Sequence, residues 1–361
     1  MNYVPDFFPI LKKTEWEILN AIPDSPRKID LARKVGIGAS HVNYILTKFS
    51  KIFLLKGIFN YQRMGLIPLV VISRRNKRKI PTYTLLVSEI TGIKKAYIHI
   101  ALVPIQYIDV YVNLIDSHPL EVIRGIEFRH WSPSSPFIEY VPLNGKNIGY
   151  LRLIKNFSDI LSKKRIKGLF NPIKLLPQRE IKIPDHIDAA IIFERMKDPF
   201  ISPKKAIENA ARHSRKYRKL LKKKSLYKIV GYHFHKHVLK LYWKRNMIVP
   251  LLPENVSPTF IAVIEGFEHA VVARIFSYVP GVRGVFIDKR KSLLVYQPFP
   301  YMQFELAKLV NKYDIDSLKL YVHTNRITDN IDIPLYMNLE EKNEKFYWKK
   351  PFVDAEATAK A

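Results

Sequence analysis

Apolar residues recur at helical spacing in two stretches of the chain, residues 39–50 and 214–227. In each stretch they form one narrow stripe, and polar or charged residues occupy the opposite face. The stripes consist of Val42, Ile45, Leu46 and Phe49 in the first stretch and of Tyr217, Leu220 and Leu221 in the second. We expect the aromatic rings of Phe49 and Tyr217 to belong to the core rather than to stack on a ligand.

A similar run precedes each stretch, at residues 25–33 and 202–212, and both runs begin with Ser-Pro. This dipeptide predicts a helix start, because serine caps the first turn and proline suits the first helical position. Amphipathic segments at 14–21 and 186–196 come before the two runs. Three short helices with a tight turn before the third, at 36–38 in the first copy, predict a helix-turn-helix that occurs twice.

The segments after the two units are predicted to form wings, a short hairpin at 52–61 and longer strands at 229–245. His233, His235 and His237 alternate, so on a strand they would share one face. Three such imidazoles could bind zinc or nickel, although contact with phosphates or solvent explains them as well. We expect no metal and no cofactor.

The remaining apolar segments predict the order β-α-β-β-α-β twice, which is that of a ferredoxin-like sheet. The first copy has expected strands at 66–73, 96–102, 107–114 and 137–142, and expected helices at 83–90 and 119–128. The second has expected strands at 259–265, 283–288, 292–296 and 318–323, and expected helices at 268–278 and 301–312. The predicted class is therefore α+β, with two winged helix-turn-helix domains and two ferredoxin-like modules in tandem.

These elements divide the chain into six parts, with a charged tail that we expect to be disordered. The parts are an arm with the first winged helix-turn-helix (1–62), the first ferredoxin-like module (63–144), a basic linker (145–184), the second winged helix-turn-helix (185–255), the second module (256–339) and the tail (340–361).

Composition narrows the classes of protein. A hydrophobic fraction of 47% excludes a disordered chain, and a net charge of +28 favours a polyanionic partner. No apolar run is long enough to span a membrane, and the N-terminus does not look like a signal peptide. The absence of cysteine excludes disulfides and fits a cytoplasmic protein.

A winged helix-turn-helix followed by a β-α-β-β-α-β module resembles the Lrp/AsnC (feast/famine) family of transcription regulators. The residues that carry the resemblance are 14–20, 32–37 and the step from Pro280 to Val285. In that family the module mediates dimerisation and can bind an amino acid. The family's Gly- and Asp-containing turn is replaced here by 103–106 and 289–291, so we expect no small-molecule effector. Duplication suggests that the family's dimer contact has become internal to one chain.

This resemblance and the charge predict an archaeal-type DNA-binding regulator, nucleoid-associated in the cytoplasm, with double-stranded DNA as partner and self-association through the modules. Hydrogen-bonding groups of the first helix would read base edges, and cations of the second would neutralise phosphates. The predicted contacts are Ser40, His41, Asn43, Tyr44, Thr47 and Lys48, and Arg215, Lys216, Arg218, Lys219, Lys222 and Lys223.

Alternatives are a weakly specific nucleoid-architectural protein and a protein that binds structured RNA or the ribosome. The basic loop 74–79 is either a further phosphate contact or a solubilising loop. No glycine-rich phosphate loop, nucleophile elbow or paired carboxylates are recognisable, so we expect no enzymatic activity.

Overall fold

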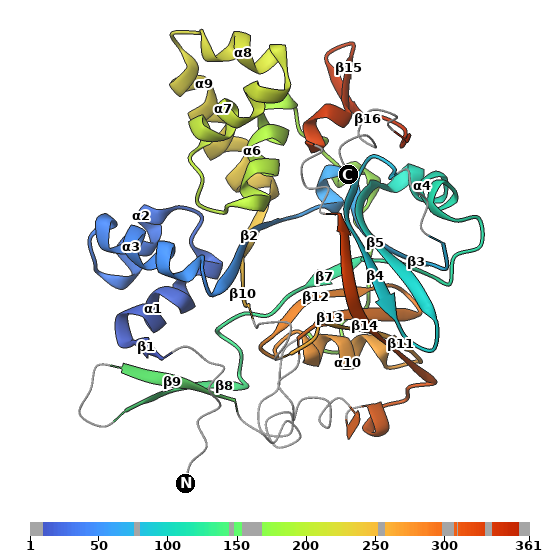
Figure 1. Cartoon of the computed structure of the whole chain (residues 1–361). Coiled ribbons are helices and arrows are strands. Elements are labelled where there is room, and N and C mark those ends of the chain that lie inside the picture. Colours follow the sequence, from blue (N-terminus) through green and yellow to red (C-terminus); the bar gives the residue numbers. More distant parts are fainter. Residues whose placement is uncertain are drawn as a thin grey trace.

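The computed structural model describes residues 10–75, 80–143, 148–153, 168–251, 257–297, 307–308, 310–328 and 334–353 (Figure 1). It is a mixed α/β fold with antiparallel sheets, which agrees with the predicted α+β class. The largest sheet has nine strands in the order β6-β3-β5-β4-β14-β11-β13-β12-β7. No helix among the described residues has the length and apolarity needed to cross a bilayer.

The nine strands form two half-sheets that pack face to face. The first contains β3 (Leu66–Ser73), β4 (Thr84–Thr91), β5 (Lys95–Pro104) and β6 (Glu121–Arg124). The second contains β11 (Phe260–Glu265), β12 (Val282–Ile287), β13 (Lys291–Tyr296) and β14 (Ser317–Thr328). The half-sheets join where β4 pairs with β14, and β7 (Glu127–Arg129) carries the chain from β6 across to β12. Strands of the two predicted modules therefore belong to one sheet within the chain.

Side-chain alternation explains why both faces of each half-sheet are apolar. Ile261 and Val263 pack between the half-sheets with Val70 and Ile98, whereas Ala262 and its alternating neighbours face the helix α10 (His269–Phe276). On the first half-sheet, α4 (Ile108–Ile115) packs on β3 and β5. Each half-sheet thus has one helix-covered face and one face buried against its counterpart.

The first module departs from the predicted elements. Residues 83–90, expected to be helical, form strand β4, and 107–114, expected to be a strand, form most of α4. The expected helix 119–128 is replaced by β6 and β7. Strand β8 (Ile138–Pro142) was predicted, but it pairs with β9 (Ile148–Leu153) in a separate sheet that includes β1 (Leu11–Lys12). The described elements of the first module run β3-β4-β5-α4-β6, which is not the order β-α-β-β-α-β.

The second module follows its predicted order where the structure describes it. Strands β11, β12, β13 and β14 and helix α10 occupy the expected positions. Of the expected helix 301–312, residues 301–306 and 309 lie outside the described residues, and 307–308 and 310–312 are helical. In the basic loop, 76–79 lie outside the described residues as well.

Two helical units lie beside the sheets (Figure 1). The first unit contains α1 (Lys13–Ala21), the short η1 (Ile22–Asp24), α2 (Lys28–Val35), α3 (Ala39–Phe49) and β2 (Phe53–Phe59). The second contains α6 (His186–Lys197), α7 (Pro203–His213), α8 (Arg215–Leu221), α9 (Leu226–Tyr232), the π-helix η5 (His233–Tyr242) and β10 (Trp243–Pro250). Phe49 and Tyr217 are buried, as expected.

The Ser-Pro prediction holds in one unit only. Ser202 caps α7 by accepting a hydrogen bond from the backbone N–H of Lys205, and Pro203 occupies the first turn. In the first unit, the Ser25 hydroxyl instead donates back to the carbonyl of Ala21, and α2 begins at Lys28.

The predicted wings are wrong in both units. Residues 53–59 form the single strand β2 rather than a hairpin, and it pairs with β10 of the other unit. Residues 229–242 are helical, in α9 and η5, so His233, His235 and His237 do not share a strand face. The strands expected in the wings, β2 and β10, instead pair with each other and form a ribbon that joins the two units.

Short elements complete the described chain. They are η2 (Gln62–Met64), η3 (Ile105–Tyr107), η4 (Gln178–Glu180), η7 (Leu335–Asn338), β15 (Leu339–Lys342) and β16 (Lys345–Trp348). The expected disorder from residue 340 is wrong for 340–353, because β15 and β16 form a hairpin that the buried Trp348 anchors. Its indole Nε1–H donates to the carbonyl of Met64 at 2.7 Å.

Candidate ligand-binding cavity

The residues predicted to read base edges lie on α3. Ser40, His41, Asn43, Tyr44 and Thr47 are exposed there. The hydroxyl of Thr47 donates to the backbone carbonyl of Asn43. Lys48 instead binds the buried carboxylate of Glu15 on α1 at 2.6 Å, so it holds two helices together.

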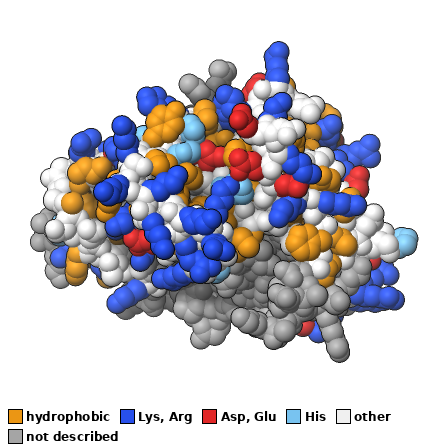
Figure 2. Space-filling view, turned by 90° about the horizontal axis from the view of Figure 1, so that it is seen from above, with side chains coloured by type: hydrophobic (Ala, Val, Ile, Leu, Met, Phe, Trp, Pro, Cys, Tyr) orange, Lys and Arg blue, Asp and Glu red, His pale blue; other side chains and the backbone are white. Residues whose placement is uncertain are grey.

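The cations predicted to bind phosphates are exposed on α8 or directly after it. They are Arg215, Lys216, Arg218, Lys219, Lys222 and Lys223. Lys216 forms an ion pair with Glu341 of the C-terminal hairpin at 3.1 Å. Figure 2, which looks down on this end of the molecule, shows Lys and Arg side chains interrupted by acidic and hydrophobic ones. The structure therefore gives a mixed surface rather than a continuous basic face.

A cavity of about 760 Å³ lies where the β2–β10 ribbon meets the sheets. Its wall combines the end of β2, strand β7, the junction of η5 with β10, residues 171–174 and the residues after α10. Six cationic side chains line it: Arg63, Arg129, Lys174, Lys240, Lys244 and Arg245. The carboxylate in the described lining is Glu127, which pairs with Arg129 and, at 2.6 Å, with the buried Arg274. The cavity therefore carries a large excess of positive charge.

Two of the arginines keep one donor without a partner among the described residues, although Arg245 also donates from Nη2 to the hydroxyl of Ser132. Within the described chain, the buried Nε atoms of Arg63 and Arg245 have no hydrogen-bond acceptor. The pKa of Lys244 is lowered, mainly because the ammonium loses hydration and secondarily because the positive charge of Arg129 lies near. The side chain nevertheless keeps accessible surface. A buried donor without an acceptor costs about 1–3 kcal/mol, so these groups favour a bound anion.

His130 places a neutral imidazole in the cavity wall. Its Nδ1 lies 2.8 Å from the backbone carbonyl of Trp131. A carbonyl only accepts, so Nδ1 carries the proton and Nε2 keeps a free lone pair. Burial lowers the pKa of His130 to about 3, and the charges of Arg245 and Lys244 act in the same direction. The ring is therefore neutral at physiological pH, and Nε2 can accept a hydrogen bond.

A second cavity, of about 550 Å³, adjoins the cationic one. The two share Ile58, Tyr61, Pro68 and Phe128. The second cavity lies between the half-sheets and has mainly aliphatic walls from β4, β5 and β11. Together the cavities form an amphipathic space, with an apolar part and a cationic part.

None of these lining residues was predicted as a site. They come from at least six segments spread between Leu54 and Asn325, so no local motif joins them. Lys240, Lys244 and Arg245 were assigned to a wing that does not form. The only signal in the sequence was the number of cations, which does not say where they converge.

No family model matches the chain, and no curated protein matches its sequence. Among solved structures, it is similar to the siroheme decarboxylase NirDL, solved in co-complex with an iron-uroporphyrin III analogue. The two share 13% sequence identity, the alignment covers 87% of this chain and 90% of that chain, and the TM-score is 0.41.

That protein is an enzyme and not a transcription regulator. The finding contradicts the assignment to the Lrp/AsnC regulators and the expectation of a non-enzymatic protein. The predicted DNA-binding function is contradicted as well, and its nucleoid-architectural and RNA-binding alternatives are unsupported. The exposed residues of α3 and α8 are therefore not assigned to DNA recognition.

Proposed function

We propose that this protein is an enzyme whose substrate is a small aromatic molecule bearing several carboxylate or phosphate groups. The main evidence for this proposal is that six cationic side chains converge on one cavity. Its described carboxylate, Glu127, is already paired. Arginine binds carboxylate and phosphate through paired hydrogen bonds, and lysine adds a point charge. An anionic substrate would neutralise the charge and satisfy the open donors of Arg63 and Arg245.

The adjoining apolar cavity supports an extended ring system as the body of the substrate. The rings of Tyr61 and Phe128 stand at the boundary between the two cavities, and Trp243 and Tyr278 line the cationic part. Aromatic faces also attract cations and pack against planar ligands. The volumes of about 550 and 760 Å³ are those of small-molecule sites.

Two groups with displaced pKa values support catalysis in this cavity. His130 is neutral at physiological pH, and Lys244 has a lowered pKa that eases its release of a proton. Groups with displaced pKa values cluster at functional sites. We assign Nε2 of His130 as a hydrogen-bond acceptor for the substrate and Lys244 as proton donor.

We also propose that the two helical units are related in architecture. In both helical units, successive helices are followed by a strand, and these strands pair as β2 and β10. This supports two diverged copies of a winged helix-turn-helix whose wing strands now build the cavity wall.

Binding is tested with pyrenetetrasulfonate, an aromatic polyanion, against pyrenemethanol, which has the same ring system without charge. At fixed salt we expect the protein to bind the polyanion, and Lys240→Gln to weaken binding about tenfold, since a hydrogen bond to a charged group contributes about 1.5–3 kcal/mol. The matched control is Lys236→Gln, one turn earlier on η5, exposed and outside the lining. Equal losses in both variants would show a general charge effect and contradict the proposal.

Catalysis is tested separately. Aromatic polycarboxylates and aromatic phosphates are incubated with the protein, and mass spectrometry follows their conversion. We expect His130→Asn to retain substrate binding, since the asparagine amide can still donate to Trp131, and to lose turnover. Turnover that is unchanged in this variant would exclude a role of His130 in the reaction.

A further inference from the structure

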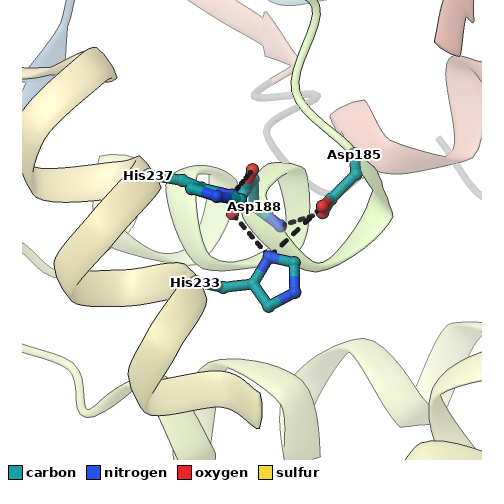
Figure 3. Close-up of side chains that lie close together, drawn as sticks. All are labelled: Asp185, Asp188, His233 and His237. Carbon is teal, nitrogen blue, oxygen red and sulfur yellow. Dashed lines mark hydrogen bonds and ion pairs between the residues drawn. The ribbon is translucent and has the colours of Figure 1, made fainter. Parts of the chain in front are cut away.

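Two short polar motifs meet at the start of the second helical unit (Figure 3). Asp185 is the N-cap of α6, and Asp188 lies in its first turn. His233 and His237 lie one turn apart on η5, which packs against α6. The spacings Asp-x-x-Asp and His-x-x-x-His therefore bring four potential metal ligands to one place, away from the residues that line the two cavities.

The four side chains converge closely. Nδ1 of His233 lies 3.0 Å from an oxygen of Asp188 and 3.2 Å from an oxygen of Asp185. Nδ1 of His237 lies 3.0 Å from the other oxygen of Asp188. One ligand atom from each residue fits within a group whose members are all within 4.8 Å of one another. In a tetrahedral site with bonds of about 2.1 Å, ligand atoms lie about 3.4 Å apart, so small side-chain shifts suffice to enclose an ion.

The surrounding structure fixes these ligands in place. The second oxygen of Asp185 accepts a hydrogen bond from the backbone N–H of Asp188 at 2.9 Å, which orients that carboxylate. Asp188 is buried, and the ring of Tyr232 packs against both imidazoles. The histidines lie on a π-helix of ten residues, a rare conformation whose single-turn form is frequent at functional sites. Local burial and backbone geometry both favour a defined site over a solvated charge cluster.

We propose that Asp185, Asp188, His233 and His237 bind one divalent transition-metal ion, with Zn²⁺ as the expected occupant. Two imidazoles and two carboxylates suit a first-row ion of intermediate softness better than Mg²⁺ or Ca²⁺, which prefer oxygen ligands alone. Four protein ligands fill a tetrahedral shell, as in structural rather than catalytic zinc sites. The ion would cross-link α6 to η5 and thereby stabilise the second helical unit.

Without a metal the same residues form ion pairs. Burial alone would lower the pKa of His233, but hydrogen bonds to Asp185 and Asp188 raise it to about 9. The alternative to a metal site is therefore a protonated histidine held between two aspartates, and the experiment must separate the two.

The full-length protein is treated with a chelator, dialysed and titrated with Zn²⁺ by calorimetry and with Co²⁺ by absorption spectroscopy. We expect one ion per chain, a tetrahedral Co²⁺ spectrum and a thermal midpoint that rises with Zn²⁺. His237→Gln and Asp188→Asn should weaken Zn²⁺ binding about 100-fold or more, because loss of a ligand exceeds the effect of a supporting residue. His235→Ala is the matched control, since His235 is exposed on the same helix and outside the group, and it should bind Zn²⁺ normally.

Asp185→Asn guards against loss of folding, because asparagine still caps α6 while it removes the charge. We expect this variant to show the wild-type circular dichroism and weakened Zn²⁺ binding. Equal weakening by His235→Ala, or an octahedral Co²⁺ spectrum with no thermal shift, would show that the four residues form ion pairs only and would overturn the proposal.

Discussion

His99 is a buried titratable side chain in the middle of β5. It is 2% exposed, and within the described chain neither ring nitrogen has a hydrogen-bond partner. Burial lowers its pKa to about 4, against a smaller opposing effect of Asp116. The unfolded chain, with a histidine pKa near 6.5, binds this proton first as the pH falls. Stability is therefore lost between pH 6.5 and about 4, by about 2 kcal/mol at pH 5 for this residue alone.

We predict that His99→Leu makes the protein less sensitive to acid. Leucine cannot be protonated, and it replaces two unsatisfied nitrogens with apolar surface, so stability at pH 7 should be equal or higher. Urea unfolding at pH 7 and pH 5 measures the change, and the wild type should lose about 2 kcal/mol more than the variant. The exposed His118, changed to Gln, is the control. Equal acid losses in wild type and His99→Leu would show that His99 does not titrate as described.

The C-terminal hairpin β15–β16 depends on one side chain. Trp348 is 2% exposed, packs edge-on against Tyr83 and donates to Met64. Trp348→Ala should cost about 3–5 kcal/mol, since it opens a large cavity and leaves a carbonyl unpaired. The half-exposed Tyr347, on the other face of the same strand, should tolerate alanine within about 0.5 kcal/mol. Thermal unfolding and limited proteolysis of the C-terminus measure both effects.

Helices with strong caps or long apolar stripes could be predicted, whereas short segments could not. Residues 39–49 form a helix as predicted, and their apolar face is the buried face. Residues 107–114 alternate as a strand would, yet Ile108, Tyr111 and Ile115 are buried at helical spacing. An eight-residue window fits both periods, and packing against β3 and β5 decides between them. Similarly, His233 and His237 were noted, but only a helix brings them together.

The candidate sites could not be predicted, because they depend on contacts between distant segments. The cationic cavity collects residues from β2, β7 and the junction of η5 with β10, and the group of four candidate metal ligands joins residues about fifty positions apart. Sequence spacing reports neighbours along one element, whereas these sites arise from how elements pack. Net charge predicted a polyanionic partner only as a class, and the DNA-binding function inferred from it was wrong.

At the scale of the whole molecule, the two helical units are joined rather than independent. Strand β10 of the second unit pairs with β2 of the first over seven residues of register. The buried Asn246 on β10 donates to the carbonyls of Ile22 and Ser25 at 3.1 and 2.7 Å. Arg195 on α6 donates to the carbonyl of Pro26 in the first unit. Since the ribbon also lines both cavities, disturbing the joint should affect the units and the ligand site together.

We predict that Asn246→Ala destabilises both units at once. It leaves the buried carbonyl of Ser25 without a donor, whereas the carbonyl of Ile22 keeps the backbone N–H of Ser25. The loss should cost about 1–3 kcal/mol, as expected for one unsatisfied buried group. Hydrogen exchange should accelerate in α1 and α2 of the first unit as well as in β10 of the second, and pyrenetetrasulfonate should bind more weakly.

The control Asn43→Ala, on the exposed face of α3, should leave exchange in both units unchanged. Faster exchange confined to β10 would mean that the units unfold independently, and the ribbon would then be a contact between two domains rather than the element that unites them.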